Sequence, residues 1–419
     1  MRRILGSWIF FFFFILVDIY VFQALRVISE SWQPRARWWL YLTYWTITLV
    51  SVGFIVSIVF TGVAGWPRLF RTYLFAMLIG LFLAKITASF FFLADDLRRV
   101  LQWSASFFTG EKSTDLGSAN ASGFPRSVFL SWVGLITGGG LFGTLLYGFG
   151  NKYSYEVRKH RLHFQNLPDA FRGFKILHIS DIHSGSFTDK NAVQKGVELI
   201  LEQNADIILF TGDIVNQTAD EMTPYIDLFS RLSAVHGVYA TLGNHDYGFP
   251  VADSEKERLR LQREMAVQVE AVHRRMGWKT LSNQHTTLEV NGEKIALIGV
   301  ENISGKANFP SFGNLSEAFS GTENIPFKIL MSHDPSHWNK EVTTAFKDID
   351  LTLSGHTHGM QFGVELPWFR WSPVKYIYKQ WAGHYKEGKQ HLYVNRGFGF
   401  IGYPGRVGIL PEITVLELI

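Results

Sequence analysis

Four long apolar segments in the first 150 residues constrain the fold of this chain more than any other feature. They run from about Ile4 to Leu25, Trp39 to Thr61, Tyr73 to Leu93 and Val128 to Tyr147. A helix needs about 20 apolar residues to cross a bilayer. Trp and Tyr gather near several ends of these segments, as they do at membrane–water interfaces. The sequence therefore predicts a transmembrane region with four helices over residues 1–150.

Two other interpretations of these segments are a buried helical core and, for the first segment, a cleaved signal peptide. A buried helical core would contain more charge than these four runs do, so a soluble domain is the weaker alternative. The first segment follows Arg2 and Arg3, as the apolar part of a signal peptide would. No small-residue cleavage site follows it, and it is long for that role. We therefore expect the first segment to stay in the protein as a membrane anchor.

Charges in and around the predicted spans give two further expectations. Asp18 and Lys85 lie inside spans, where a charge is costly and indicates either a transport pathway or a structural ion pair. If the N-terminus is inside, eight Lys and Arg face the cytoplasm and seven face out. The positive-inside rule then favours, by a small margin, a cytoplasmic location for the part of the chain that follows.

The remainder of the chain has a different pattern. A polar linker is expected over residues 151–172, followed by a second domain over residues 173–419. In that domain strand-like runs such as Lys175–Ser180 alternate with amphipathic stretches such as Ala192–Gln203, which predicts an α/β fold. Cys is absent, which excludes disulfides and cysteine nucleophiles. The net charge of +4 is modest, so no nucleic acid is expected as a partner.

Five clusters of metal-type ligands occur in order in the second domain, each after an apolar run. They are Asp181-Ile182-His183, Gly212-Asp213, Gly243-Asn244-His245-Asp246, Ser332-His333-Asp334 and Gly355-His356-Thr357-His358. One cluster alone would be unremarkable as a turn, but five in series are hard to explain by packing. Ligand clusters at the carboxyl ends of strands match where sites form in such sheets. The pattern predicts a metal site.

The residue types suit hydrolysis of a phosphate ester. Two divalent ions about 3.5–4 Å apart neutralise the ester, orient it and activate water. A bridging carboxylate with imidazole and amide ligands favours Mn, Fe, Zn or Co over a purely oxygen-ligated Mg site. Two divalent metal ions are therefore the expected cofactors.

The ordered clusters resemble the calcineurin-like metallophosphoesterase superfamily. That resemblance implies a layered β-sandwich flanked by helices, and metal-dependent hydrolysis of phosphoric esters or pyrophosphates. It also implies seven metal ligands, in which Asp213 bridges the ions. The first ion would be bound by Asp181, His183 and His358, and the second by Asn244, His333 and His356.

The same resemblance implies two catalytic residues. His245 would donate a proton or a hydrogen bond to the leaving oxygen, and Asp246 would hold its ring. Two positions depart from the usual pattern. Asn216 stands where the second cluster often ends in Asp. The fifth cluster often continues as Gly-Gly-Gln, whereas here Met360 replaces the second Gly and bears on the lip of the pocket.

The C-terminal part narrows the resemblance. Asn395–Gly399, Arg406 and Pro411–Thr414 look like the membrane-linked branch that contains YkuE- and YaeI-type phosphoesterases. That branch includes enzymes that cleave UDP-2,3-diacylglucosamine, which implies a bacterial inner-membrane protein. The similarity covers about Lys175 to the C-terminus and does not include the predicted spans.

An aromatic and basic segment between His358 and His384 bears on the substrate. Seven aromatic residues there alternate with Arg370, Lys375 and Lys379, which is typical either of a membrane interface or of a packed loop. We expect the lipid bilayer as a partner and a phosphoester or lipid-linked substrate. Two alternatives remain: a membrane transporter or receptor with a regulatory phosphoesterase-like domain, and a catalytically dead scaffold. The complete ligand set argues against the scaffold.

Overall fold

The computed structural model describes residues 2–63, 65–109, 126–306 and 309–419. The chain divides into two compact units, Met1–Tyr147 and Gly148–Ile419. Because their relative placement is undetermined, each unit is described by itself.

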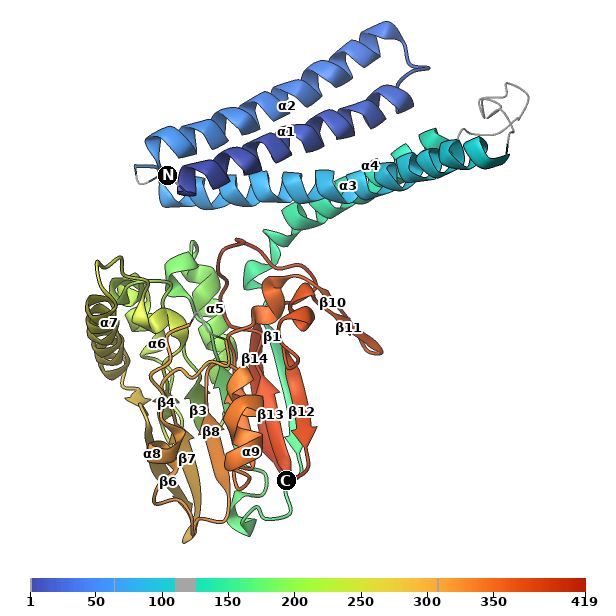
Figure 1. Cartoon of the computed structure of the whole chain (residues 1–419). Coiled ribbons are helices and arrows are strands. Elements are labelled where there is room, and N and C mark those ends of the chain that lie inside the picture. Colours follow the sequence, from blue (N-terminus) through green and yellow to red (C-terminus); the bar gives the residue numbers. More distant parts are fainter. Residues whose placement is uncertain (1, 64, 110–125, 307–308) are drawn as a thin grey trace. The chain divides into compact units, whose positions relative to one another are not determined.

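The first unit is helical (Figure 1). Its helices are α1 (Arg2–Ile28), α2 (Pro34–Thr61), α3 (Arg68–Thr109) and α4 (Arg126–Gly148). Among the described residues three of them, α2, α3 and α4, are long and apolar enough to cross a membrane. All four predicted segments are thus helical, and α3 continues well beyond the predicted span.

Asp18 and Lys85, the charges noted inside the spans, form a buried ion pair between α1 and α3. The Thr48 hydroxyl of α2 donates to Asp18 Oδ1 over 2.6 Å, and the Tyr44 hydroxyl donates to the Asp18 carbonyl oxygen over 2.8 Å. An unpaired charge in such a place would be strongly destabilising. The cluster therefore links three helices through one carboxylate.

The second unit contains two mixed sheets of six strands each. The first sheet has the order β1 (Glu156–Leu162), β14 (Glu412–Leu418), β2 (Lys175–Ile179), β3 (Ile207–Phe210), β4 (Val238–Ala240) and β5 (Lys279–Thr280). The second has the order β12 (Gly383–Glu387), β13 (Gln390–Val394), β9 (Leu351–Ser354), β8 (Lys328–Met331), β7 (Glu293–Gly299) and β6 (Gln284–Val290). Strands β2 to β5 are parallel to one another, as are β7, β8, β9 and β13.

Side-chain alternation explains why these strands form a sandwich. Successive residues of a strand point to opposite faces. In β3, Ile207 and Leu209 pack in the core between the sheets, whereas Ile208 and Phe210 pack against helices. Both faces of β3 are therefore buried, which is why its four residues are all apolar.

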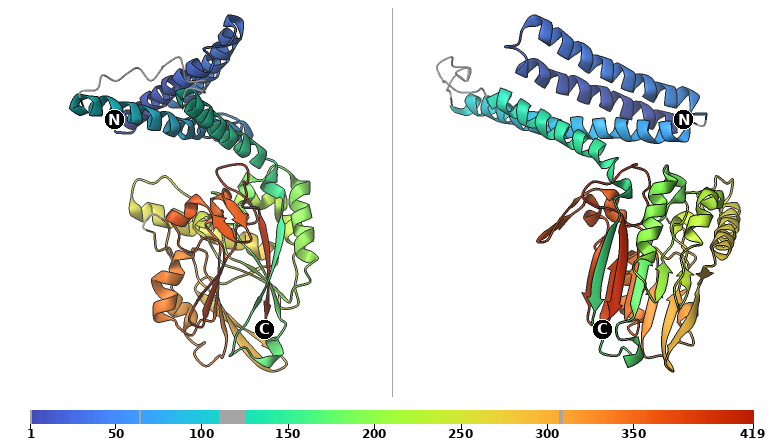
Figure 2. Two further views of the ribbon diagram at one scale, coloured as in Figure 1. Left: turned by 90° about the vertical axis from the view of Figure 1, so that its right-hand side faces the viewer. Right: turned by 180° about the vertical axis from the view of Figure 1, so that it is seen from behind.

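Helices cover the two outer faces of the sandwich (Figure 2). The first sheet packs against α5 (Lys190–Leu201), α6 (Ile226–Phe229) and α7 (Glu255–Arg275). The second packs against α8 (Leu315–Phe319) and the turn around Trp338. The predicted fold, a layered β-sandwich flanked by helices after a four-helix membrane region, is confirmed.

The range 151–172, expected to be a linker, contains strand β1. It pairs in parallel with β14 from Glu156 to Leu162 and so extends the first sheet. The strand lies at the edge of the sheet and is only partly buried, so polar residues occupy most of its length. That composition is the reason it resembles a linker in sequence.

Candidate metal centre

The predicted ligands lie at the carboxyl ends of neighbouring parallel strands. In the first sheet Asp181 follows β2, Asp213 follows β3 and Asn244 follows β4. In the second sheet His333 follows β8 and His356 follows β9. Because parallel strands end at the same edge, residues far apart in sequence meet there. The two sheets thus present their ligands to one place.

The backbone at these ligands is unusual. Asp181, His183, Asp213, His356 and His358 all have positive φ angles, between 46° and 71°. Side chains other than Gly rarely adopt this left-handed conformation, and it persists only where the surrounding structure imposes it. Such strain is concentrated at functional sites, because it aims side chains where a regular turn would not.

Neighbouring glycines allow the ligand loops to approach closely. A Cβ atom at Gly355 would collide with the Asp181 carboxylate, and one at Gly243 would collide with that of Asp213. The glycines of two predicted clusters are therefore required by packing around the carboxylates, in addition to any role in the turn.

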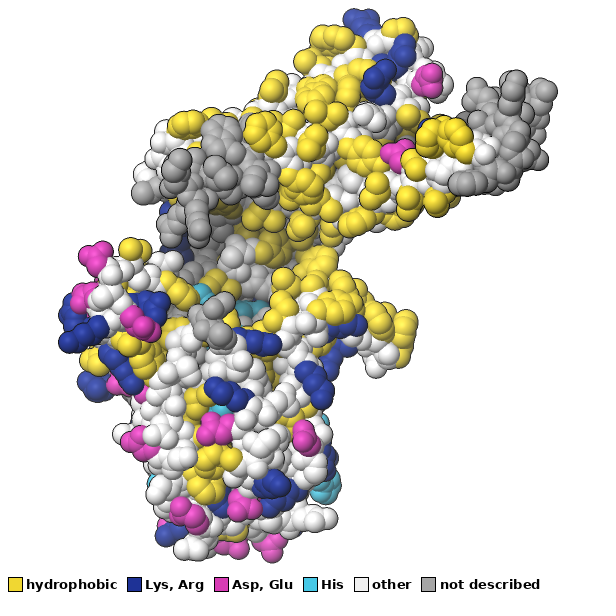
Figure 3. Space-filling view, viewed as in Figure 1, with side chains coloured by type: hydrophobic (Ala, Val, Ile, Leu, Met, Phe, Trp, Pro, Cys, Tyr) yellow, Lys and Arg dark blue, Asp and Glu magenta, His cyan; other side chains and the backbone are white. Residues whose placement is uncertain are grey.

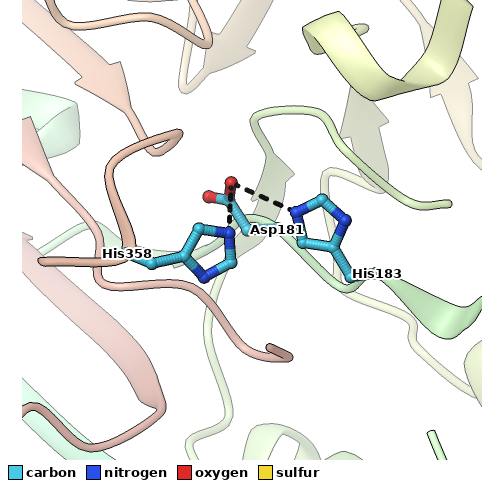
Figure 4. A group of neighbouring side chains, drawn as sticks. All are labelled: Asp181, His183 and His358. Carbon is cyan, nitrogen blue, oxygen red and sulfur yellow. Dashed lines mark ion pairs between the residues drawn. The ribbon is translucent and has the colours of Figure 1, made fainter. Parts of the chain in front are cut away.

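One candidate group consists of Asp181, His183 and His358, whose ligand atoms lie within 4.8 Å of one another. His358 Nε2 lies 3.2 Å and His183 Nε2 lies 3.9 Å from Asp181 Oδ1. Figure 4 shows the carboxylate between the two rings. All three side chains are buried. These are the three residues expected to bind the first ion.

The other candidate group consists of Asp213, His333 and His356, again within 4.8 Å. His333 Nε2 lies 3.2 Å from Asp213 Oδ2. His333 Nδ1 lies 2.7 Å from the Thr211 carbonyl oxygen, so it donates its proton there and leaves Nε2 with a lone pair toward the site. Three of the four residues expected around the second ion, counting the bridging Asp213, are therefore together.

Asp213 also lies close to the first group. Its Oδ2 atom is 3.6 Å from His183 Nε2, and its Oδ1 atom accepts a hydrogen bond from the His245 backbone N–H over 2.7 Å. A single carboxylate thus borders both groups of ligands. Asn244 lines the same cavity as His183, Asp213, His356 and His358.

Unsatisfied atoms test whether these residues fit a metal ion. His183 Nδ1 and Nε2, His358 Nε2 and Asn244 Oδ1 are buried without a hydrogen-bond partner. A buried polar atom left unpaired costs about 1–3 kcal/mol. Several such atoms beside two carboxylates form a donor set of nitrogen and oxygen, which fits divalent cations such as Mn, Fe, Zn or Co.

The electrostatics of Asp213 and His333 also fit a cation. Burial alone would lower the pKa of His333, but the adjacent Asp213 carboxylate raises it to about 10. Burial acts to raise the pKa of Asp213, and His333 and His245 outweigh it, so this pKa lies below its usual value. The carboxylate therefore favours positive charge between these side chains, where a proton or a divalent cation is stabilised.

His245 lines the cavity but belongs to neither ligand group. Its Nδ1 atom lies 2.8 Å from the carbonyl oxygen of Asn216. The expectation that Asp246 holds this ring is therefore wrong. Consecutive side chains on the short turn Asn244–Tyr247 point in different directions, and a backbone carbonyl holds the ring instead.

Asp246 has another position in the structure. Its Oδ2 atom accepts from the N–H groups of Gly243 and Asp213 over 2.8 and 2.7 Å, and its Oδ1 atom accepts from Ile214 N–H over 2.9 Å. Burial and the Asp213 carboxylate raise the pKa of Asp246 to about 7, against the effect of the N–H donors. Asp246 thus joins the loops that carry Asp213 and Asn244.

The ligand groups open on a cavity of about 430 Å³. Its lining includes metal-type ligands and His245. It also includes the apolar or aromatic residues Phe309, Val374, Ile377, Tyr378 and Ile401, together with Lys306. The cavity can therefore hold a substrate that is anionic at one part and apolar at another.

Sequence reasoning missed two residues that support the ligands. The Tyr378 hydroxyl lies 2.7 Å from His356 Nε2. The buried Arg406 donates to the carbonyl oxygens of Arg396 and Gly397 over 2.8 and 3.1 Å, beside His358. In the sequence, Tyr378 is noticeable only as part of an aromatic segment and Arg406 only as part of the family resemblance. Neither residue has a sequence signal that indicates support of a metal ligand.

Comparison with protein families gives two matches. A model described as "Probable Calcineurin-like phosphoesterase, transmembrane domain" matches residues 1–151. A model described as "Calcineurin-like phosphoesterase" matches residues 174–360, which include every predicted metal ligand.

Individual relatives agree with these models. The chain is 31% identical over 292 residues to uncharacterized metallophosphoesterase YkuE of Bacillus subtilis, covering 68% of this chain and 92% of that protein. It is 31% identical over 270 residues to phosphodiesterase YaeI of Escherichia coli, covering 63% and 88%. A transmembrane protein with metallophosphoesterase domain from Danio rerio is 28% identical over 61% of this chain and 55% of its own length.

Proposed function

This chain belongs to the calcineurin-like metallophosphoesterase family, and from that premise we propose that it hydrolyses a phosphodiester or pyrophosphate bond of a lipid-linked substrate. The family relationship makes it a metal-dependent phosphoester hydrolase with a membrane domain. The observation that carries the proposal is the meeting of two Asp–His groups on one cavity.

We assign the ligands as follows. The first ion would be held by Asp181, His183 and His358, a second ion would be held by Asn244, His333 and His356, and Asp213 would serve both. When bound, two divalent cations would screen the negative charge of the phosphoester and activate water for attack. The distances of Asp213 to His183 and His333, 3.6 and 3.2 Å, support its bridging role.

His245 is assigned to the leaving oxygen. Because its Nδ1 atom bonds to the Asn216 carbonyl oxygen, Nε2 is the ring atom available to the cavity. In the imidazolium form Nε2 can donate a proton to an alkoxide or phosphate that departs. General acid catalysis of this kind contributes typically about 10²–10⁴-fold.

The lipid-linked substrate is supported by the apolar wall of the cavity and by the membrane domain. A soluble phosphoester needs neither an apolar wall such as that of Val374, Ile377 and Ile401 nor a transmembrane anchor. UDP-2,3-diacylglucosamine has a pyrophosphate next to acyl chains and is our candidate substrate. We also assign Mn²⁺ as the ion to test first.

The first experiment is hydrolysis by the full-length chain in detergent. UDP-2,3-diacylglucosamine in mixed micelles is incubated with Mn²⁺ or with a chelator, and UMP release is measured. Release that requires Mn²⁺ and is lost in His245→Ala supports the proposal. Cleavage of only a generic aryl phosphodiester would keep the reaction class and reject the lipid-linked substrate. Absence of both activities from the metal-loaded protein would reject hydrolysis.

We place the catalytic domain on the cytoplasmic side of a bacterial inner membrane. The natural chain has no Cys, so a single Val235→Cys variant, at an exposed position of the second unit, carries the only thiol. Intact cells are treated with a membrane-impermeant maleimide. Protection until the cells are lysed supports the cytoplasmic location, and labelling of intact cells rejects it.

A second candidate function, transport or reception, is favoured by one observation, the buried Asp18–Lys85 pair. Asp18 Oδ2 is buried without a hydrogen-bond partner, as a transient ion or proton site would be. An Asp18→Asn variant that retains hydrolysis but loses a measurable transmembrane flux would support this function. If the substitution changes both hydrolysis and folding, the Asp18–Lys85 pair has a structural role.

A further inference from the structure

A small hairpin in the second unit exposes an unusual amount of apolar surface. It consists of β10 (Val364–Leu366) and β11 (Phe369–Trp371), which pair only with each other among the described strands. The hairpin extends away from the rest of the unit (Figures 1 and 2). At its turn Trp368 is 82% exposed, and Leu366 and Phe369 are nearly half exposed.

The exposed apolar surface continues past the hairpin. Tyr376 is 75% exposed and Ile377 is 55% exposed. Figure 3 shows hydrophobic side chains gathered over this part of the unit, with basic side chains next to them. A two-stranded hairpin is marginally stable in water, and a contiguous apolar patch usually marks a surface that another phase or molecule covers.

The unpaired charges of residues 364–379 are positive. Glu365 is the only acidic residue between positions 364 and 379, and it is paired with Arg396 and Arg158. Lys375 and Lys379 are both exposed. The surface therefore offers aromatic rings and cations with no unpaired carboxylate, which complements the headgroups of an anionic bilayer.

The base of the hairpin is tied to the start of the second unit. The Gly363 N–H donates to the Val407 carbonyl oxygen, and the Arg406 N–H donates to the Gly148 carbonyl oxygen, each over 2.9 Å. Gly148 is the last residue of the apolar helix α4. Two backbone hydrogen bonds and the peptide bond between Arg406 and Val407 therefore connect the base of the hairpin to Gly148, the first residue of the second unit.

We propose that residues 364–377 form a membrane arm, whose tip at Trp368 inserts into the headgroup layer of an anionic bilayer. Strands rise about 3.3 Å per residue, so four residues reach about 13 Å. The headgroup region of one leaflet is about 5–8 Å deep. The hairpin is thus long enough to bring its tip to the acyl boundary, as interfacial anchors do.

The membrane arm is continuous with the cavity. Val374 and Ile377 belong to the arm and also line the cavity, and Tyr378 follows directly. The exposed arm and the cavity thus share Ile377, which is next to Tyr378, whose hydroxyl contacts His356. If the proposed function holds, the arm lets the acyl part of a substrate stay in lipid while its phosphate reaches His356.

The test uses the absence of Cys from the natural chain. A Trp368→Cys variant of the full-length protein is labelled with bimane and placed in nanodiscs, one copy per disc, that contain phosphatidylglycerol. Lipids with a nitroxide on the acyl chain are then added. We expect at least about twofold quenching and a blue-shifted emission, since the tip lies at the acyl boundary.

The matched control is Val235→Cys, which is 85% exposed in the same unit. Its label should stay water-exposed and unquenched. Equal exposure of both labels to water would overturn the proposal. A label at position 368 that is shielded from water but not quenched by lipid would also overturn it, because a second copy or another protein segment would then cover the arm.

A second variant tests the apolar tip itself. In a Tyr376→Cys background, Leu366→Ser with Phe369→Ser should reduce lipid quenching by about half or more while the thermal unfolding of the protein is unchanged. Unchanged quenching would contradict the proposal. These readouts do not require substrate, so a failure to hydrolyse UDP-2,3-diacylglucosamine would reject the proposed substrate and leave the membrane arm standing.

Discussion

The Nδ1 atom of His245 lies 2.8 Å from the carbonyl oxygen of Asn216, and the carboxylate of Asp246 bonds to backbone N–H groups instead of that ring. Two adjacent residues of one motif therefore have separate tasks. His245 presents a ring nitrogen to the cavity, whereas Asp246 holds the loops that carry the ligands. Substitution of His245 should therefore affect turnover, whereas substitution of Asp246 should affect stability.

We expect His245→Ala to retain metal and lose turnover, while Asp213→Ala loses both. His245 is in neither ligand group, and general acid catalysis is worth about 10²–10⁴-fold in rate. Asp213 borders both groups, so its loss removes a ligand from each. Metal content by mass spectrometry and turnover are measured on both variants. Equal metal loss in the two would contradict this division of roles.

Asp246→Asn should reduce stability more than it changes the pH profile. The amide offers one acceptor oxygen in place of two, so at least one buried N–H among those of Gly243, Asp213 and Ile214 loses its partner, at about 1–3 kcal/mol. Thermal unfolding and the pH dependence of kcat are compared with the natural chain. A shifted pH profile at unchanged stability would mean that Asp246 acts on His245 after all.

Tyr378→Phe should weaken one metal site selectively. The Tyr378 hydroxyl is within hydrogen-bond distance of His356 Nε2 and orients the ring. Loss of a hydrogen-bond partner of a metal-binding His costs about 10–100-fold in metal affinity. Tyr376→Phe, two residues earlier and largely exposed, is the matched control. Calorimetric titration with Mn²⁺ should show weaker binding of one ion by Tyr378→Phe and unchanged binding of both ions by Tyr376→Phe. An equal loss of affinity for both ions would contradict the assignment of His356 to one site.

The stability of the second unit should fall in mild acid because of His273. Burial lowers the pKa of His273 from 6.5 to about 3. Between these values the unfolded chain binds a proton that the native chain excludes, so stability declines as pH falls below 6.5, by at most about 1.4 kcal/mol per pH unit. Denaturant unfolding between pH 5 and 7, followed by Trp fluorescence, measures the slope. His273→Gln should flatten it, and an unchanged slope would assign the acid sensitivity to other groups.

Sequence patterns predicted the elements that are apolar throughout. The candidate membrane helices and the buried strand β3 are apolar along their length, and such composition is typical of segments surrounded by lipid or by a protein core. Strand β1 and the hairpin β10–β11 were missed. Each is at an edge or isolated, so polar or mixed residues suit it, and no period stands out.

The site followed the same division. Each cluster of ligands was visible because it follows a strand-like run with residues that packing does not require. The partners that orient His333 and His245 were not visible, because they are the backbone carbonyl groups of Thr211 and Asn216. Any residue type supplies a carbonyl group, so side-chain identity carries no information about it.

The sequence by itself determined which chemistry is available: the types and order of the ligands, the membrane helices, and the family. Only the tertiary structure decided the distances between the ligands, the contact of Tyr378 with His356, and that a carbonyl instead of Asp246 holds His245. The physical reason is that composition records the burial and propensity of each residue where it stands. Contacts between β2, β3, β8 and β9 depend on how two sheets align, and that alignment is set by the packing of the whole core.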